Sequence, residues 1–94
     1  MFDMMLENYS TGWNTVADDA FVRWMTHDLE STLYEVTAYL QPQQKRMYLS
    51  KIRSWRPRLR TMRISDALSE ASVLRMSMFN SALSNVETRT RLVR

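Results

Sequence analysis

The chain lacks cysteine altogether and has one glycine and two prolines among its 94 residues. Without cysteine there are no disulfide bonds and no cysteine-based zinc sites. One glycine is too few for a glycine-rich phosphate loop, and so little glycine and proline disfavours an all-β fold with many tight turns. No apolar run approaches the roughly eighteen residues of a membrane span, and the N-terminus lacks the basic region of a secretory signal. We therefore expect a cytoplasmic protein without a membrane partner.

Acidic side chains are missing from residues 37–64. This stretch holds eight basic residues instead: Lys45, Arg46, Lys51, Arg53, Arg56, Arg58, Arg60 and Arg63. The formal net charge of +3 hides the asymmetry, because residues 1–40 carry seven acidic residues and one basic residue, whereas residues 41–94 carry three and twelve. A positive field of this kind attracts nucleic acid, an acidic protein or an anionic lipid surface.

The rest of the composition indicates a small helical domain. Apolar residues make up 45% of the chain, so we expect it to fold, and its length suits one domain spanning residues 1–94. A chain of this size buries only about 60–65% of its unfolded surface, which makes independent stability marginal. Apolar residues at helical spacing predict an all-α fold, a helical hairpin plus a third helix, which gains further core as a homodimeric bundle.

Capping and helix-breaking residues divide the chain into five segments. We expect an N-terminal arm over residues 1–13, an acidic helix over 14–40, a basic helix over 42–63, a third helix over 65–88 and a frayed basic tail over 89–94. Thr15 and Ser65 are candidate N-caps, and Pro42 suits the first turn of the basic helix, where its missing N–H is no loss.

The acidic helix is apolar on two opposite sides. A core stripe on one side consists of Val22, Met25, Leu29, Leu33, Val36 and Leu40. The other side carries a second strip that includes Ala20, Trp24, His27 and Tyr34. Because a helix that is apolar on two sides contacts two neighbours, we predict that this second strip is a dimer or partner interface.

The basic helix combines an apolar seam with a row of arginines. The seam follows spacings of four, three, four and three, and consists of Tyr48, Ile52, Trp55, Leu59 and Met62. Such a period predicts core packing for Tyr48 and Trp55 rather than stacking on bases. Pro57 must either kink the helix or break it, and the uninterrupted seam favours a kink.

The third helix has an apolar repeat of its own at spacings of three, four and three, formed by Met76, Phe79, Leu83 and Val86. The residues flanking this repeat are Ala67, Ala71, Met78 and Ala82. Arg75 falls within the apolar arc. A buried unpaired guanidinium is too costly, so Arg75 either extends to solvent or reaches a carboxylate on the acidic helix or a partner.

No pattern in the chain encodes catalysis. His27 is the only histidine, and its neighbour Asp28 points about 100° away around a helix, so no Ser–His–Asp arrangement is local. The adjacent acids Asp18 and Asp19 suit the positive end of a helix dipole. We expect a non-enzymatic protein with no cofactor, no metal and no small-molecule substrate.

The basic segment therefore carries the functional hypothesis. We predict that an arginine row contacts the phosphate backbone of duplex RNA or DNA by shape and charge, with the contacts made by Arg46, Arg53, Arg56, Arg60 and Arg63. Support is expected from Lys45, Lys51 and Arg58. Two alternatives stay open. The face docks an acidic protein, as in an adaptor, chaperone or inhibitor, or the acidic helix neutralises it by pairing Asp28 and Glu35 with Lys45, Arg46 or Arg53.

Overall fold

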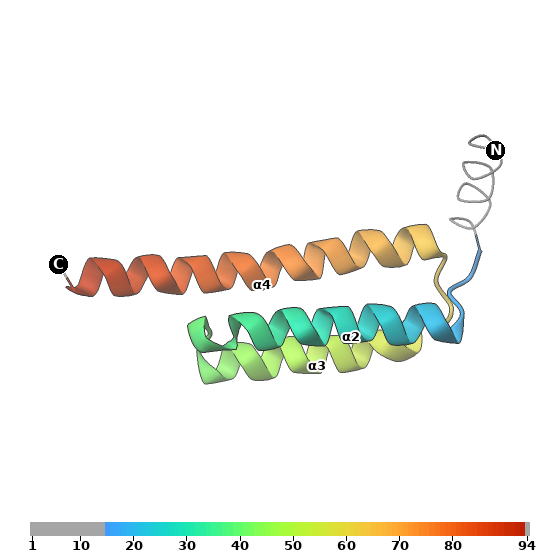
Figure 1. Cartoon of the computed structure of the whole chain (residues 1–94), viewed down its shortest axis with the longest axis horizontal. Coiled ribbons are helices and arrows are strands. Elements are labelled where there is room, and N and C mark those ends of the chain that lie inside the picture. The colour runs from blue at the N-terminus through green and yellow to red at the C-terminus, as the bar shows by residue number, and fades with distance from the viewer. Residues whose placement is uncertain (1–14, 94) are drawn as a thin grey trace.

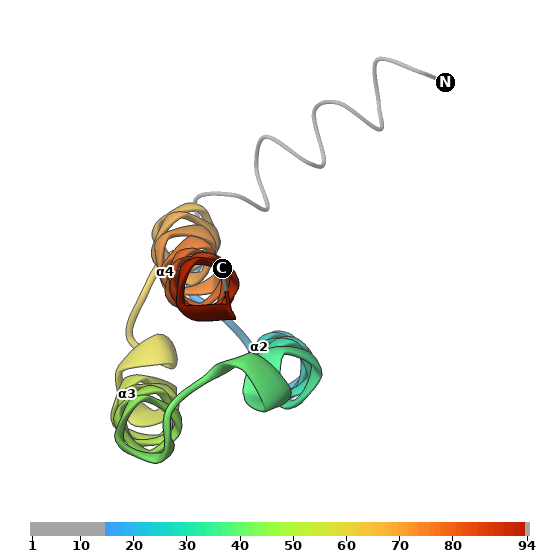
Figure 2. The same cartoon turned by 90° about the vertical axis from the view of Figure 1, so that its left-hand side faces the viewer.

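The computed structural model describes residues 15–93, and the arm predicted for residues 1–13 lies outside them. Four helical elements follow one another: α2 (Asp19–Val36), the short 3-10 helix η1 (Thr37–Tyr39), α3 (Pro42–Leu59) and α4 (Ile64–Val93). α2 and α3 form a hairpin, and α4 lies along it (Figure 1). Viewed end-on, the three helices form a triangle (Figure 2). The predicted all-α hairpin with a third helix is confirmed.

α2 begins at Asp19, several residues after the predicted start near residue 14. Its N-cap is Asp18, whose Oδ1 accepts a hydrogen bond from the Phe21 N–H at 2.8 Å. The prediction of Thr15 as N-cap is wrong. An aspartate is among the strongest N-cap residues, and here it stands directly before the first helical residue.

The extended backbone before α2 pairs with the segment after α3. Val16 forms an isolated antiparallel bridge with Arg63, and the Ala17 N–H donates to the Met62 carbonyl at 3.0 Å. This pairing keeps the residues before Asp18 out of the helix. It also fastens the two ends of the hairpin to each other.

α2 tightens into η1 before the chain turns. The Thr37 hydroxyl donates to the Leu33 carbonyl at 2.6 Å, and helical structure stops at Tyr39, close to the predicted end at residue 40. Pro42 occupies the first position of α3, as predicted.

α3 ends at Leu59, so the predicted kinked helix reaching residue 63 is wrong. Pro57 lies in the last turn and has no N–H to donate to the Arg53 carbonyl, which removes one of the final helical bonds. A tighter turn follows, in which the Thr61 N–H donates to the Arg58 carbonyl at 3.0 Å. The predicted arginine row is therefore divided between α3 and this turn.

α4 is longer than predicted at both ends. It begins at Ile64, so Ser65 lies within the first turn, and it continues through the predicted frayed tail to Val93. No glycine or proline interrupts the C-terminal end. The hydroxyls of Thr88 and Thr90 donate to carbonyls four residues earlier, both at 3.0 Å. In Figure 1 this end of α4 extends past the hairpin.

The core lies between the three helices and uses both predicted stripes of the hairpin. α2 buries Val22, Met25, Leu29, Leu33 and Val36. α3 buries Tyr48, Ile52, Trp55 and Leu59. α4 contributes mostly small residues, namely Ala67, Ala71, Met78 and Ala82. None of the helices described is long and apolar enough to cross a membrane.

Candidate nucleic-acid interface on α3

All eight basic residues of the acid-free stretch are exposed. Six of them lie on α3, namely Lys45, Arg46, Lys51, Arg53, Arg56 and Arg58. Arg60 is the C-cap residue, and Arg63 lies in the bridge that follows. Because α3 contains no acidic residue, positive charge accompanies the helix along its whole length.

Arg46 and Arg53 keep the predicted spacing of seven residues, about 10.5 Å along the helix axis. Arg60 has helical backbone angles (φ −66°, ψ −18°), so it continues the row one residue past the end of α3. Its Nη2 lies 3.6 Å from Asp19 Oδ1, but both side chains are largely exposed. Such a surface pair contributes little and leaves Arg60 able to exchange partners.

The acidic helix leaves Arg46 and Arg53 of this row without an ion pair. Asp28 binds Arg75 of α4, with Oδ2 and Nη2 2.5 Å apart, instead of a basic residue of α3. The alternative in which Asp28 and Glu35 pair with Lys45, Arg46 or Arg53 is therefore not observed. Arg75 reaches a carboxylate of the acidic helix, which was one of its two predicted outcomes. Within residues 15–93 the ion pairs leave six of the eight basic residues unpaired, namely Lys45, Arg46, Lys51, Arg53, Arg56 and Arg63.

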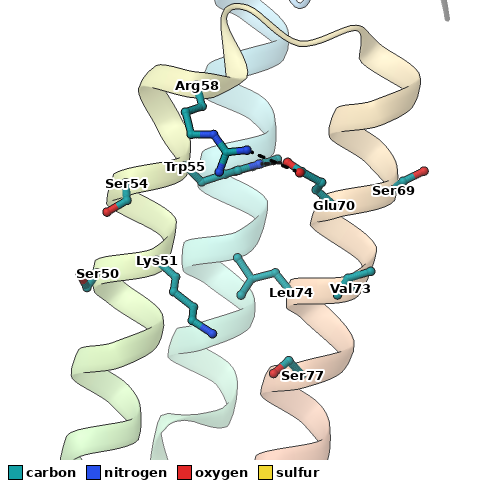
Figure 3. Close-up of a pocket in the computed structure, with 10 residues that line it drawn as sticks. All are labelled: Ser50, Lys51, Ser54, Trp55, Arg58, Ser69, Glu70, Val73, Leu74 and Ser77. Atoms are coloured by element: carbon teal, nitrogen blue, oxygen red, sulfur yellow. Dashed lines mark hydrogen bonds and ion pairs between the residues drawn. The ribbon is translucent and has the colours of Figure 1, made fainter.

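A groove of about 580 Å³ runs between α3 and α4 (Figure 3). Lys51 and Arg58 line it from α3, and Leu74 lines it from α4. Glu70 connects the two walls, because it accepts a hydrogen bond from the Trp55 indole N–H at 2.7 Å and lies 3.7 Å from the Arg58 guanidinium. The groove is thus partly apolar and carries one acidic group among its basic ones.

The basic residues consequently form two groups. On a helical projection Lys51 and Arg58 point about 140° away from Arg46 and Arg53. Lys51 and Arg58 belong to the groove, and Lys51 Nζ lies 5.9 Å from the centre of the Tyr48 ring. A single flat or gently curved polyanion cannot contact both groups equally. The outward row with Arg46 and Arg53 is therefore the main candidate for phosphate contact. Lys51 and Arg58 in the groove are less favourably placed for it.

The aromatic residues of α3 hold the helix against α4. The Tyr48 hydroxyl donates to the Ser77 carbonyl at 2.9 Å and lies 2.6 Å from the Ser81 hydroxyl oxygen. Trp55 is bound to Glu70 across the groove. Both rings are buried, so they anchor the basic helix rather than offer a surface for base stacking.

The second strip of α2 is exposed, as its position opposite the core stripe requires. Trp24 is 58% exposed and Tyr34 is 84% exposed, and Ala20 and His27 are also at the surface. The Phe21 ring lies 5.9 Å from the Trp24 ring. The role of this strip as an interface stays a prediction.

The sequence interpretation missed one surface. The regular seam of α4, formed by Met76, Phe79, Leu83 and Val86, does not face the core: its members are 38–62% exposed. Val73, beside the seam, is 71% exposed. Periodicity detects an apolar stripe but does not say which of two stripes packs inward. The alanines on the neighbouring side of the helix were the available signal, since small residues permit close helix approach.

The described part of the chain offers no metal centre, because no three His, Asp or Glu side chains between residues 15 and 93 lie close enough to share an ion. His27 is exposed on α2 and borders a shallow depression with Glu30 and Tyr34. The expectation of a non-enzymatic protein stays a prediction.

Comparisons of the chain with protein-family models, curated proteins and solved structures find no match.

Proposed function

We propose that this chain is a small non-enzymatic protein that binds the phosphate backbone of duplex RNA or DNA as a homodimer. The outward row on α3, consisting of Arg46, Arg53 and the adjoining Arg60, makes the main contacts. Arg56 and Arg63 extend this surface. Recognition depends on shape and charge rather than on base sequence.

The observation that supports this proposal most strongly is the uncompensated charge of α3. Every basic side chain of the helix is exposed, and α2, the acidic neighbour, directs its one strong ion pair to Arg75 of α4. Arginine is also the side chain best suited to phosphate, because its planar guanidinium donates two parallel hydrogen bonds.

The length of the row suits a polyanion rather than a single anion. Arg46 and Arg53 lie about 10.5 Å apart along α3, so their side chains can reach separate phosphates of one duplex. Gln44, which has the donor and acceptor pattern needed to read a base, is instead held by hydrogen bonds to Asn85 and to the Gln41 N–H.

Salt titration of binding tests the proposal. We expect the wild-type chain to bind duplex RNA or DNA with a steep dependence of log K on log salt. The Arg46→Ala, Arg53→Ala, Arg60→Ala triple variant should lose about three units of that slope, since each lost phosphate contact removes about one. Single-stranded RNA and DNA are titrated in parallel to test the preference for duplexes.

A matched control separates the row from net charge. Compared with Arg53→Ala in the row, Arg23→Ala removes the same charge from an exposed position on α2. It should keep most of the wild-type slope. The proposal fails if the triple row variant and the wild type bind duplexes equally, or if Arg23→Ala loses as much slope as Arg53→Ala.

The second candidate function is an interaction module whose basic face docks an acidic protein. The exposed Trp24 and Tyr34 favour it, because aromatic side chains at a surface commonly anchor protein interfaces. This candidate predicts a complex that survives nuclease treatment. The nucleic-acid proposal predicts that the material which co-purifies with the chain is lost on nuclease treatment.

A further inference from the structure

The outer side of α4 carries a complete apolar seam with no neighbour among the described helices. Met76, Phe79, Leu83 and Val86 recur at spacings of three, four and three, the pattern by which one helix packs along another. The hairpin contacts a different side of α4, about 110° around the helix from the seam, where Ala71 and Met78 are buried. An apolar stripe of this length on a small protein marks an interaction surface.

We infer that the outer seam of α4 is the homodimer interface, and that two copies pair there with their α4 helices antiparallel. The inference names the surface and orientation of the dimer in the proposed function, but it needs nothing from the basic face. The occupant of the seam is a second copy of this chain.

The seam matches a reversed copy of itself. The spacing of three, four and three reads the same in both directions, so an antiparallel copy meets it residue by residue. Met76 of one copy then faces Val86 of the other, and Phe79 faces Leu83. These contacts form four layers about a twofold axis near residue 81, and each layer pairs side chains of complementary size.

Charge along α4 favours the antiparallel orientation. The N-terminal end bears Asp66 and no basic residue, whereas the C-terminal end bears Arg89 and Arg91 with the single acid Glu87. Glu70 does not contribute, because Trp55 and Arg58 already bind it in the groove. An antiparallel pair brings acidic ends next to basic ends, while a parallel pair brings like charges together. The interaction between the two helix dipoles also favours the antiparallel pair.

The length of α4 supports a second copy of the chain as the molecule that covers the seam. Asn85 donates hydrogen bonds to the Tyr39 carbonyl and to Gln44, which ties α4 to the turn between α2 and α3. The helix then continues to Val93, about 12 Å further. In the antiparallel pair this end packs against the first turns of the other α4.

The alternative surface on α2 is less continuous. Trp24 and Tyr34 are ten residues apart, about 15 Å along the helix, with the polar His27 and Ser31 between them on the same side. Two separated aromatic residues serve as anchors for a small contact. They do not form the continuous seam that a helix-to-helix dimer needs.

Molecular mass in solution, measured by sedimentation equilibrium without nucleic acid, tests the surface. We expect the wild type to have twice the 11.2 kDa chain mass. Leu83→Glu should reduce the mass to that of one chain and keep the helical circular dichroism, because Leu83 is 60% exposed. Tyr34→Glu, the matched change on α2, should stay dimeric.

Two results would overturn the inference. If Tyr34→Glu dissociates and Leu83→Glu stays dimeric, the wild type is a homodimer whose interface lies on α2 and not on α4. A wild-type chain that remains at one chain mass throughout the micromolar range removes the dimer itself. Neither result bears on phosphate binding, which the salt titration measures separately.

Disulfide trapping tests the orientation, and the absence of native cysteine makes the background zero. A Met76→Cys chain mixed with a Val86→Cys chain should form mixed disulfides in preference to disulfides within either variant, because only antiparallel helices bring these positions together. Efficient self-linking of the Met76→Cys chain would show parallel pairing and overturn the antiparallel arrangement.

Discussion

Two buried threonines on α2 differ in what their hydroxyl groups contact. The Thr32 hydroxyl donates to the Asp28 carbonyl at 2.9 Å. Thr26 is only 5% exposed, and its hydroxyl has no hydrogen-bond partner among the residues described. A buried hydroxyl without a partner costs free energy on folding, because it gives up its hydrogen bonds to water.

Thr26→Val should therefore stabilise the protein. Valine has nearly the same shape as threonine and removes the unpaired hydroxyl, so we expect the free energy of unfolding to rise by about 1 kcal/mol. Thr32→Val is the control, and because it loses a hydrogen bond it should give no gain. Urea denaturation followed by circular dichroism measures both, and a destabilised Thr26→Val variant contradicts the explanation.

The sequence predicted what kind of contact a single residue makes, but it did not predict which residue is contacted. The apolar surroundings of Arg75 indicated that its guanidinium must reach solvent or a carboxylate, and it binds Asp28. The sequence left the partner of Asp28 open between the basic helix and Arg75. A helical projection gives the direction of a side chain, whereas the identity of the facing residue depends on how helices are arranged in three dimensions.

At the scale of elements, hydrogen bonds from two buried aromatic residues of α3 connect it to α4. Tyr48 contacts Ser77 and Ser81, and Trp55 contacts Glu70 across the groove. These contacts lie along the side of the groove and hold the basic helix at a fixed distance from α4. The orientation of the arginine row therefore depends on residues that are not themselves charged.

Tyr48→Phe tests this connection. It keeps the buried ring and removes the hydroxyl, so we expect a loss of about 1–2 kcal/mol in the free energy of unfolding. Tyr39→Phe serves as the control because the Tyr39 ring is half-exposed and the contact of this residue with Asn85 uses its backbone carbonyl. Equal stabilities for the two variants, measured by chemical denaturation, would mean that the Tyr48 hydroxyl does not hold α3 against α4.

The helices themselves were largely predictable, because apolar periodicity and Pro42 mark their core faces and one boundary. Two features of the helices were not predictable, namely the end of α3 and the side of α4 that is buried. Pro57 was expected to bend a continuing helix, but the lost backbone bond comes so near the end that the chain turns instead. On α4 two stripes compete, and the core takes the one with small residues because they let α4 approach α2 closely.

At the scale of the whole molecule, the proposed dimer predicts that thermal stability depends on concentration. Association favours the folded state by mass action, so the wild-type Tm should rise as protein concentration increases. Leu83→Glu should show a Tm that is lower and independent of concentration. Differential scanning calorimetry over a hundredfold concentration range measures this, and a constant wild-type Tm would contradict folding coupled to association.

The division of charge between α2 and α3 gives the chain a permanent electric dipole across the hairpin. α2 holds four acidic residues and one basic residue, and α3 holds six basic residues and no acidic one. A polyanion within reach of this field exerts a torque that turns α3 toward it before contact. The aromatic strip with Trp24 would then lie on the side of the hairpin away from the polyanion. It would therefore still face solvent when the chain meets a nucleic acid.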